Sequence, residues 1–224
     1  MFAIWLLATG ISVPTYILPP PGAEGWRALV FPRVEKQTRY EPAEFEGRPV
    51  LRAEARCSAS ALLHAVPGLS LARTPWLHWR WRVDRDLPAR DARTKAGDDF
   101  AARVYVAFRF EPARSSGWER LKRGAARLVY GGELPGSALN YVWSASEPAG
   151  SSWTSPYTPQ SRMISLAAGP AGEWRAERVD LQADYRRVFA AEPPPVEFVA
   201  VMSDADDGCA EALAWFADLR FAQE

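Results

Sequence analysis

The sequence predicts an all-β protein, an antiparallel β-sandwich of the jelly-roll type with two short helical insertions. Three observations lead to this fold class. Apolar and polar residues alternate with period two in many segments, which is the pattern of half-buried strands. Turn-forming residues separate these segments. The chain has 224 residues, of which 48% are hydrophobic and 24% charged, and this composition is typical of a globular protein with a sizeable core.

The first strands are expected where the alternation is clearest, in residues 50–55, 77–83, 100–110 and 139–144. Within 77–83 every other residue is apolar, and polar residues such as Arg80 and Arg82 stand between them. One face of each strand should therefore pack in a core and the other should meet solvent. We expect five large aromatic side chains to be buried: Trp79, Trp81, Phe108, Trp143 and Trp215.

Two further strands are expected near the C-terminus. Residues 198–202, "FVAVM", are apolar on both faces, which predicts a central strand. Residues 213–221, "LAWFADLRF", return to alternation and predict a strand that is its neighbour.

Two segments have helical rather than strand spacing. The first begins with a capping box formed by Ser116 and Glu119, and two glycines after residue 130 end it. Its apolar positions are Trp118, Leu121, Ala125 and Leu128. The second runs from an N-cap at Asp180 to Phe189, and the proline run that follows forbids its continuation.

The N-terminal segment, residues 1–22, is an uncharged apolar run followed by prolines. It is too short and interrupted for a spanning helix and is closer to the apolar region of a secretory signal, although it has no positive residue before that region. We expect it to be cleaved or membrane-associated, with few contacts to a single domain at 23–224, and we expect the protein to be exported. Cys57 and Cys209 would then be free to pair in an oxidising compartment.

The charge balance narrows the classes of partner. Twenty-seven basic residues balance 27 acidic ones, so no overall field points to nucleic acid, and membrane association is expected only through the N-terminal segment. The chain has ten tryptophans, which suit cores and sugar-stacking surfaces alike. The best candidates for an exposed platform lie outside the clear core-facing runs: Trp118, Trp153 and Trp174.

Five motifs in order resemble a bacterial family known as DUF3047, a domain of unknown function. They are "WRWRVD", "KAGDDFAARVYVAF", "LNYVWS", "ERVDLQADYRRVF" and "VMSDADDGCAEALAWFADLRF", and the resemblance covers residues 24–222. In the last motif, Asp207 and Gly208 stand where the family pattern has Asn and Thr. The resemblance implies export in bacteria and a sandwich similar to carbohydrate-binding modules, and it supplies no substrate.

Aspartates at two strand ends form the candidate site. Asp98 and Asp99 precede one expected strand, and Asp204, Asp206 and Asp207 follow another. If these loops meet at one rim, each pair of carboxylates about 4 Å apart repels by roughly 1 kcal/mol in water and roughly 4 kcal/mol at an effective dielectric constant near 20. Such a cluster needs a cation or an arginine partner.

Three interpretations of this cluster remain open. It is a turn with arginine salt bridges, a Ca²⁺ site, or a ligand-binding or catalytic site. The metal ligands would be Asp204, Asp206 and Asp207. The ligand-binding set would be Asp98, Asp99, Arg103, Arg80, Asp204 and Asp206.

Three functions follow from these interpretations. The first is an exported, non-catalytic module that binds a glycan or another cell-envelope ligand. The second is a polysaccharide hydrolase or lyase that uses the cluster of Asp98, Asp99, Arg103, Asp204 and Asp206. The third is a structural partner domain of an envelope assembly. The sequence contains neither G-x-S-x-G nor H-E-x-x-H and singles out no pair of carboxylates, which favours the first function.

Overall fold

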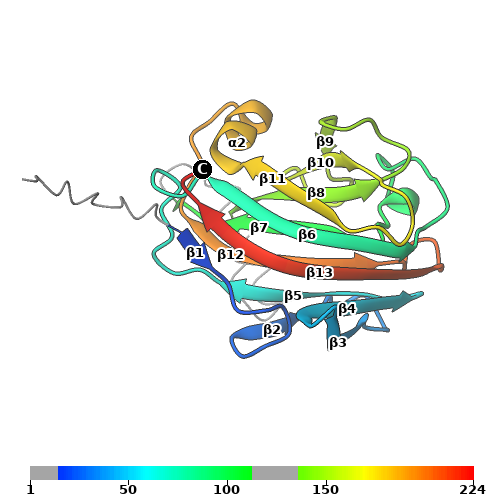
Figure 1. Cartoon of the computed structure of the whole chain (residues 1–224). Helices are drawn as coiled ribbons and strands as arrows, with labels where there is room; N and C mark the ends of the chain where they lie inside the picture. Colours follow the sequence, from blue (N-terminus) through cyan, green and yellow to red (C-terminus); the bar gives the residue numbers. More distant parts are fainter. Residues whose placement is uncertain (1–14, 113–135) are drawn as a thin grey trace, which may run out of the picture.

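The computed structural model describes residues 15–112 and 136–224, which form two β-sheets packed face to face (Figure 1). Sheet A has the order β11 (Arg175–Asp180), β6 (Trp76–Arg85), β13 (Glu211–Ala222), β4 (Arg48–Arg56) and β3 (Arg39–Phe45), and β1 (Thr15–Ile17) also pairs with β13. Sheet B has the order β2 (Trp26–Leu29), β5 (Ala59–Ala65), β12 (Val196–Asp204), β7 (Arg103–Phe108), β8 (Ser137–Ser144), β10 (Ser161–Ala167) and β9 (Ser152–Thr154). The predicted all-β sandwich is confirmed.

Strand pairing differs from the prediction at one place. Strands β8 and β10 run parallel. All other described strand pairs are antiparallel, as predicted. The short strand β9 stands between β8 and β10 in sequence and pairs with β10 rather than with β8. Because β9 turns the chain round before β10 begins, β10 can join the free edge of β8 in the parallel direction.

The predicted helix after Asp180 is confirmed as α2 (Leu181–Phe189). The Asp180 carboxylate accepts hydrogen bonds from the backbone N–H groups of Gln182 and Ala183, which satisfies two donors of the first turn. The helix ends at Ala190, whose φ of 51° is left-handed. One turn of 3-10 helix, η1 (Lys95–Gly97), lies between β6 and β7. The helix predicted from Ser116 lies outside the described residues.

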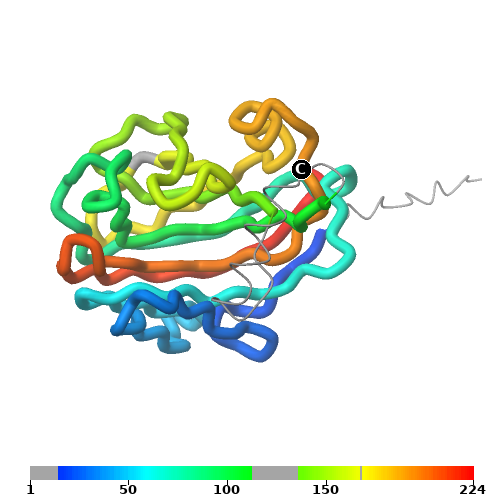
Figure 2. Tube along the Cα trace, turned by 180° about the vertical axis from the view of Figure 1, so that it is seen from behind, coloured from blue at the N-terminus to red at the C-terminus, as the bar shows by residue number. Residues whose placement is uncertain are grey.

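The last two strands lie in different sheets. β12 is central in sheet B, between β5 and β7, as predicted. β13 is not its neighbour, because it lies in sheet A between β6 and β4, and that prediction is wrong. Residues 205–210 cross from one sheet to the other at one end of the sandwich, as Figure 2 shows from behind. The acidic stretch is therefore the crossing point between the two layers.

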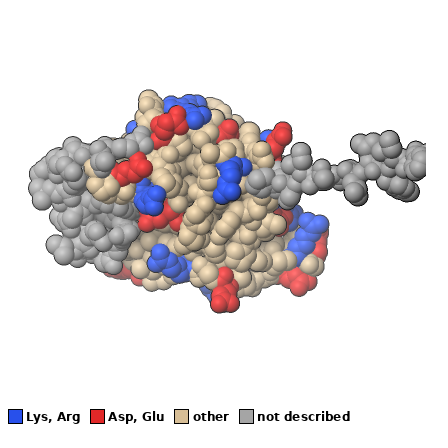
Figure 3. Space-filling model, turned by 90° about the vertical axis from the view of Figure 1, so that its left-hand side faces the viewer, with Lys and Arg blue, Asp and Glu red and all other residues tan. Residues whose placement is uncertain are grey.

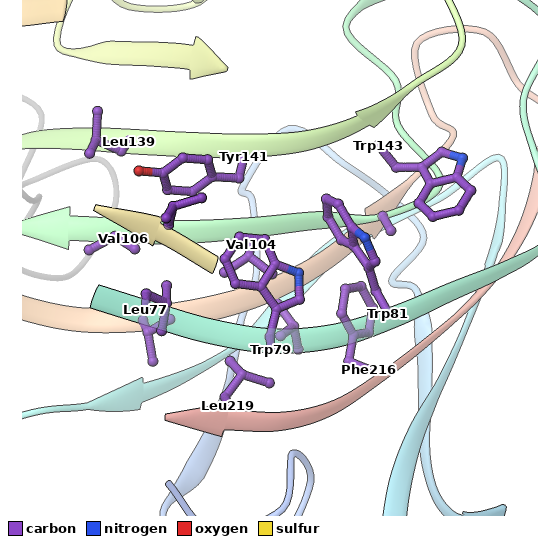
Figure 4. Packing of buried hydrophobic residues seen from close by; sticks show 14 of the residues in the cluster. Leu77, Trp79, Trp81, Val104, Val106, Leu139, Tyr141, Trp143, Phe216 and Leu219 are labelled. Carbon is purple, nitrogen blue, oxygen red and sulfur yellow. The ribbon is translucent and has the colours of Figure 1, made fainter. Parts of the chain in front are cut away.

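Large aromatic residues fill the space between the sheets (Figure 4). The rings of Trp79 and Trp81 meet edge to face at 5.4 Å, and those of Trp81 and Trp143 at 5.8 Å. These three and Phe108 are buried, as predicted. Trp215 is not in this core: it lies half-buried on the outer face of sheet A and donates a hydrogen bond to Asp84 at 2.9 Å. The alternation of β13 directs Phe216 inward, so its neighbour Trp215 must face outward.

The described part of the N-terminal segment belongs to the sandwich. Residues 15–17 pair with the end of β13, and Leu18 is only 4% exposed. The prediction that residues 1–22 make few contacts with the domain is therefore wrong for these residues. Residues 1–14 lie outside the described residues, so their role as an export signal stays a prediction. Within 15–112 and 136–224, no helix has the length and apolar character needed to span a membrane.

A disulfide joins Cys57 to Cys209 across 152 residues of chain. Cys57 lies in the turn between β4 and β5, and Cys209 lies in the 205–210 crossing. The pairing that the sequence left open is thus formed, and it ties the crossing to the neighbouring turn. The backbone N–H of Cys57 also donates to the carbonyl of Ala210 at 2.9 Å, so the two segments are joined twice.

Candidate functional site

The two acidic stretches meet at one end of the sandwich, as the sequence predicts. β7 and β12 are antiparallel neighbours, and Arg103 at the start of β7 stands opposite Met202 near the end of β12. The loop that enters β7 and the crossing that leaves β12 must therefore lie side by side. We call the surface formed by residues 86–103, residues 204–210 and Tyr157, which contacts Asp207, the rim. Its interior holds a buried ion network, and its surface holds a group of carboxylates.

Arg103 is the centre of the buried network. It is only 4% exposed, and its guanidinium donates two hydrogen bonds to the Asp204 carboxylate, one of them from Nε to Oδ1 at 2.7 Å. It also donates to the backbone carbonyl of Asp98, and its Nη1 lies 3.5 Å from Asp98 Oδ1. The guanidinium stacks against the Phe100 ring, 4.6 Å from its centroid. This is the arginine partner that the sequence predicted for the aspartates.

One guanidinium does not neutralise all the negative charge that is gathered here. Burial raises the pKa of Asp98 to about 6, although Arg103 acts to lower it. Burial also raises the pKa of Asp204, against the opposing effect of the same guanidinium. Asp206 and Asp207 have raised pKa values as well, through partial burial and their carboxylate neighbours. The rim thus favours either protons or a cation.

We expect Asp98 to make the stability of the protein depend on pH in the unusual direction. Its pKa rises from 3.8 to about 6 on folding, so the folded state binds more protons between these values, and stability increases as pH falls through this window. The full effect is about 3 kcal/mol, from 1.36 kcal/mol per pKa unit. Denaturant unfolding between pH 7 and pH 4 should show the wild type gaining stability relative to Asp98→Asn. Parallel pH curves for the two proteins would contradict this.

The surface of the rim is organised around Asp99 and Asp207. The Asp99 carboxylate accepts hydrogen bonds from the backbone N–H groups of Asp207 at 3.1 Å and Gly208 at 2.6 Å. A side chain at Gly208 would bring a Cβ within 2.9 Å of Asp99, which explains the glycine. The Tyr157 hydroxyl donates to the Asp207 carboxylate at 2.5 Å. Asp99 therefore holds the crossing in place, and Asp207 holds a tyrosine.

Tyr157 is the rim residue that sequence reasoning missed. Its side chain comes from the loop between β9 and β10, and it is 53% exposed. The ammonium group of Lys95 lies 5.3 Å from its ring centroid. Burial raises the pKa of the Tyr157 hydroxyl, and its hydrogen bond to Asp207 raises it further. The one sequence signal was an aromatic residue in a turn rich in serine and proline, "TSPYTPQ".

The carboxylates that lie close enough to share a cation differ from the predicted set. Oxygens of Asp99, Asp206 and Asp207 lie within 4.8 Å of one another. Asp204 was expected among the metal ligands, but Arg103 holds both of its carboxylate oxygens. The three remaining carboxylates supply only part of the six to eight oxygens that Ca²⁺ takes. Calcium binding stays a prediction, with Asp99 in place of Asp204.

The hollow at the rim is small. Its volume is about 30 Å³, and its lining includes Asp99, Phe100, Trp143 and Ser144. This is room for about two water molecules, by the volume that one water probe occupies. Neither Asp98 nor Asp204 lines it. This hollow is too small for a sugar ring, so a sugar could meet these residues only on the rim's outer surface.

Arg80 is not part of the rim. It lies on the outer face of sheet A, where its Nε is 2.6 Å from an Asp218 oxygen and its guanidinium lies 5.1 Å from the Trp174 ring centroid. Trp174 directly precedes β11, which is one edge strand of the sheet, and Phe45 ends β3, which is the opposite edge strand. The ring centroids of these two residues lie 5.7 Å apart. Since the two edges of the sheet meet in this way, its outer face must be concave.

Neither of the two described tryptophans that were proposed as exposed platforms is exposed. Trp153 is only 8% exposed, and its Nε1 donates to the carbonyl of Ala92 at 3.0 Å, so the prediction is wrong for this residue. Trp174 is half-buried between Phe45 and Arg80. Trp118 lies outside the described residues. At the rim it is a tyrosine rather than a tryptophan that offers an exposed ring.

Comparisons with known proteins give one family and several distant structures. The family model described as "Protein of unknown function (DUF3047)" matches residues 24–220. No curated protein matches the sequence.

Similar solved structures include a family 30 carbohydrate-binding module of a cellulosomal cellulase of Clostridium thermocellum, with 11% identity over 95% of this chain and 99% of that chain and a TM-score of 0.49. A family 11 carbohydrate-binding module from Clostridium thermocellum, in complex with a β-1,3-1,4-mixed-linked tetrasaccharide, has 6% identity, coverage of 94% and 96%, and a TM-score of 0.46. Endoglucanase 3 of Trichoderma harzianum, from family GH12, has 10% identity, coverage of 95% and 97%, and a TM-score of 0.44.

Proposed function

This chain belongs to the DUF3047 family of proteins of unknown function, and we propose that it is an exported, non-catalytic module that binds a glycan or another cell-envelope ligand at the rim. The ligand-binding surface is formed by Tyr157 together with Asp99, Asp206 and Asp207. The buried network around Arg103 serves as the support beneath this surface.

The observation that carries the proposal is an exposed aromatic ring fixed beside three carboxylates. A sugar presents C–H groups on its ring faces and hydroxyl groups around its edge. Tyr157 is 53% exposed, and its ring suits the C–H faces, while carboxylates accept hydrogen bonds from hydroxyl groups. The hydrogen bond to Asp207 holds Tyr157 in place before the ligand arrives, so little side-chain entropy is lost on binding.

The same geometry disfavours the hydrolase or lyase alternative. Glycoside hydrolysis needs two carboxylates that face a bound sugar at a defined separation. Asp98 and Asp204 are 4% and 2% exposed, and both lie against Arg103. Their raised pKa values reflect burial under the rim rather than contact with a cleft. The rim hollow of about 30 Å³ holds no sugar ring.

The disulfide supports the exported location. Disulfides form and persist in secreted and periplasmic proteins and are rare in the reducing cytosol. Cys209 is exposed, so a reducing environment would have direct access to the Cys57–Cys209 bond. The acidic crossing that this bond fixes would then lose one of its attachments.

A glycan array probed with the full chain tests the proposed function, followed by calorimetry on any glycan that binds. We expect Tyr157→Ala to weaken binding at least ten-fold, because the stacking face is removed. Tyr157→Phe keeps the ring and should retain more affinity than the alanine variant. Asp207→Asn removes a charge in the site and should reduce affinity. Its matched control is Glu46→Gln, which removes a charge on the exposed β3–β4 turn and should leave affinity unchanged. Full binding by Tyr157→Ala would reject the rim as the binding surface, and no glycan bound by the wild type would reject a glycan as the ligand.

A further inference from the structure

Three basic side chains lie in one row on the outer face of sheet A. Arg178 of β11 stands directly opposite His78 of β6, and Arg220 of β13 stands opposite the same histidine from the other side. The row lies near the start of β6 and the end of β13, whereas the rim adjoins the other ends of these strands (Figure 1). Basic groups placed directly opposite one another repel, so the row needs an explanation.

The other arginines on this face have acidic partners. Arg80 pairs with Asp218 at 2.6 Å, and Arg82 pairs with Asp84 at 2.6 Å. Among residues 15–112 and 136–224, no carboxylate lies within 4.0 Å of the Arg178 or Arg220 guanidinium. Arg178 is instead held over the Trp76 ring, with its guanidinium carbon 3.9 Å from the centroid. Viewed from the end of the molecule nearest this row, acidic and basic residues are interspersed (Figure 3).

The imidazole of His78 has one N–H group without a hydrogen-bond acceptor among the described residues. Arg220 Nη2 lies 3.3 Å from His78 Nδ1, and because a guanidinium only donates, Nδ1 is the acceptor. The proton of the neutral imidazole therefore sits on Nε2. This Nε2 is buried and has no hydrogen-bond partner within the described residues. A buried donor without an acceptor is unfavourable by about 1–3 kcal/mol.

We propose that Arg178, His78 and Arg220 form a binding site for an oxyanion, the phosphate or sulfate group of a small or polymeric ligand. A guanidinium fork matches two oxygens of such a group, and the imidazole N–H supplies a further donor from the middle strand. Arg178 is exposed, so an anion can reach its guanidinium from solvent, and the buried imidazole of His78 stands next to it in the row, between Arg178 and Arg220. This site is independent of the glycan surface at the rim.

The electrostatic surroundings of His78 agree with this assignment. Its pKa lies below the ordinary value of 6.5, first through burial and then through Arg220 and Arg178. The charged groups directly opposite His78 are Arg178 on β11 and Arg220 on β13. The other charged groups of these two strands have partners of their own: Asp218 with Arg80, Glu211 with Arg85, Glu177 with Arg175, and Asp180 as the N-cap of α2. A bound anion would reverse the effect of the two guanidinium groups and raise the pKa of His78.

The two histidines of the chain make the test direct. Inorganic phosphate is titrated into the full chain at constant ionic strength, and the imidazole signals are followed by NMR. We expect the His78 signal to shift and saturate, and its pKa to rise by about one unit, which corresponds to ten-fold tighter phosphate binding by the protonated ring. His64, which packs against Trp26 in sheet B, is the internal reference and should not respond.

Variants separate a built site from a general effect of charge. Arg178→Gln and Arg220→Gln should each lower the phosphate affinity at least ten-fold. Arg85→Gln removes the same charge from an exposed pair with Glu211 and should leave the affinity unchanged. A titration with glucose 6-phosphate shows whether the natural ligand is a free ion or a phosphate group on a larger molecule. Tighter binding of glucose 6-phosphate than of inorganic phosphate would indicate a larger ligand, and equal binding would indicate the free ion. Linear, parallel shifts of both histidines, or an equal loss in Arg85→Gln, would overturn the proposal.

Discussion

Replacing Arg103 by leucine is expected to lower the free energy of unfolding by about 3–5 kcal/mol, the range measured when one partner of a buried ion pair is removed. The substitution leaves the Asp204 carboxylate buried, only 2% exposed, without the guanidinium that donates to both of its oxygens. Asp98 loses its cation at the same time. The loss should be largest near neutral pH and smaller near pH 4, where the aspartates take up protons. Urea unfolding at both pH values measures it.

A double-mutant cycle tests whether the effect belongs to the pair. Arg103→Leu combined with Asp204→Asn should cost less stability than the two single changes added together, because the second change removes the uncompensated charge. Arg80→Leu is the matched control, since it breaks an arginine–aspartate contact of 2.6 Å whose side chains are 27% and 42% exposed. It should cost at most about 1 kcal/mol. Additive single effects would show that the rim aspartates are turn residues and no more.

Removing the disulfide is expected to have the second largest effect. The Cys57–Cys209 bond closes a span of 152 residues, and the loop-entropy relation gives about 5 kcal/mol for a span of this size. Since measured effects are commonly smaller, we expect the Cys57→Ser/Cys209→Ser variant to lose about 3–5 kcal/mol. Glycan binding at the rim should weaken as well, because Asp206 and Asp207 lie in the segment that the bond ties down.

Dithiothreitol supplies the control for this variant. It should lower the unfolding midpoint of the wild type to that of the double serine variant and leave the variant itself unchanged. Thermal and urea unfolding with and without the reductant make the comparison. If the serine variant had the same unfolding midpoint as the oxidised wild type, the backbone hydrogen bond between Cys57 and Ala210 would be sufficient to fix the crossing.

Several elements were predictable because their cause is local. Period-two alternation in residues 77–83 determined which side chains of β6 face the core, since successive residues of a strand point to opposite faces. The Asp180 side chain and the prolines after residue 192 determined both ends of α2. The meeting of Asp98 with Asp204 was also predictable, because Asp98 comes shortly before one strongly apolar strand and Asp204 ends another.

The sequence by itself determined the sandwich, the inward face of its strands and the need of the clustered aspartates for an arginine. Only the tertiary structure decided that β13 leaves the sheet of β12, that Tyr157 reaches Asp207, and that Arg178 and Arg220 flank His78. Alternation identifies the buried face of a strand, but it does not identify the strand that lies beside it. Pairing and register between distant segments come from the fit of the whole core, and the contacts of Tyr157 and His78 depend on that fit.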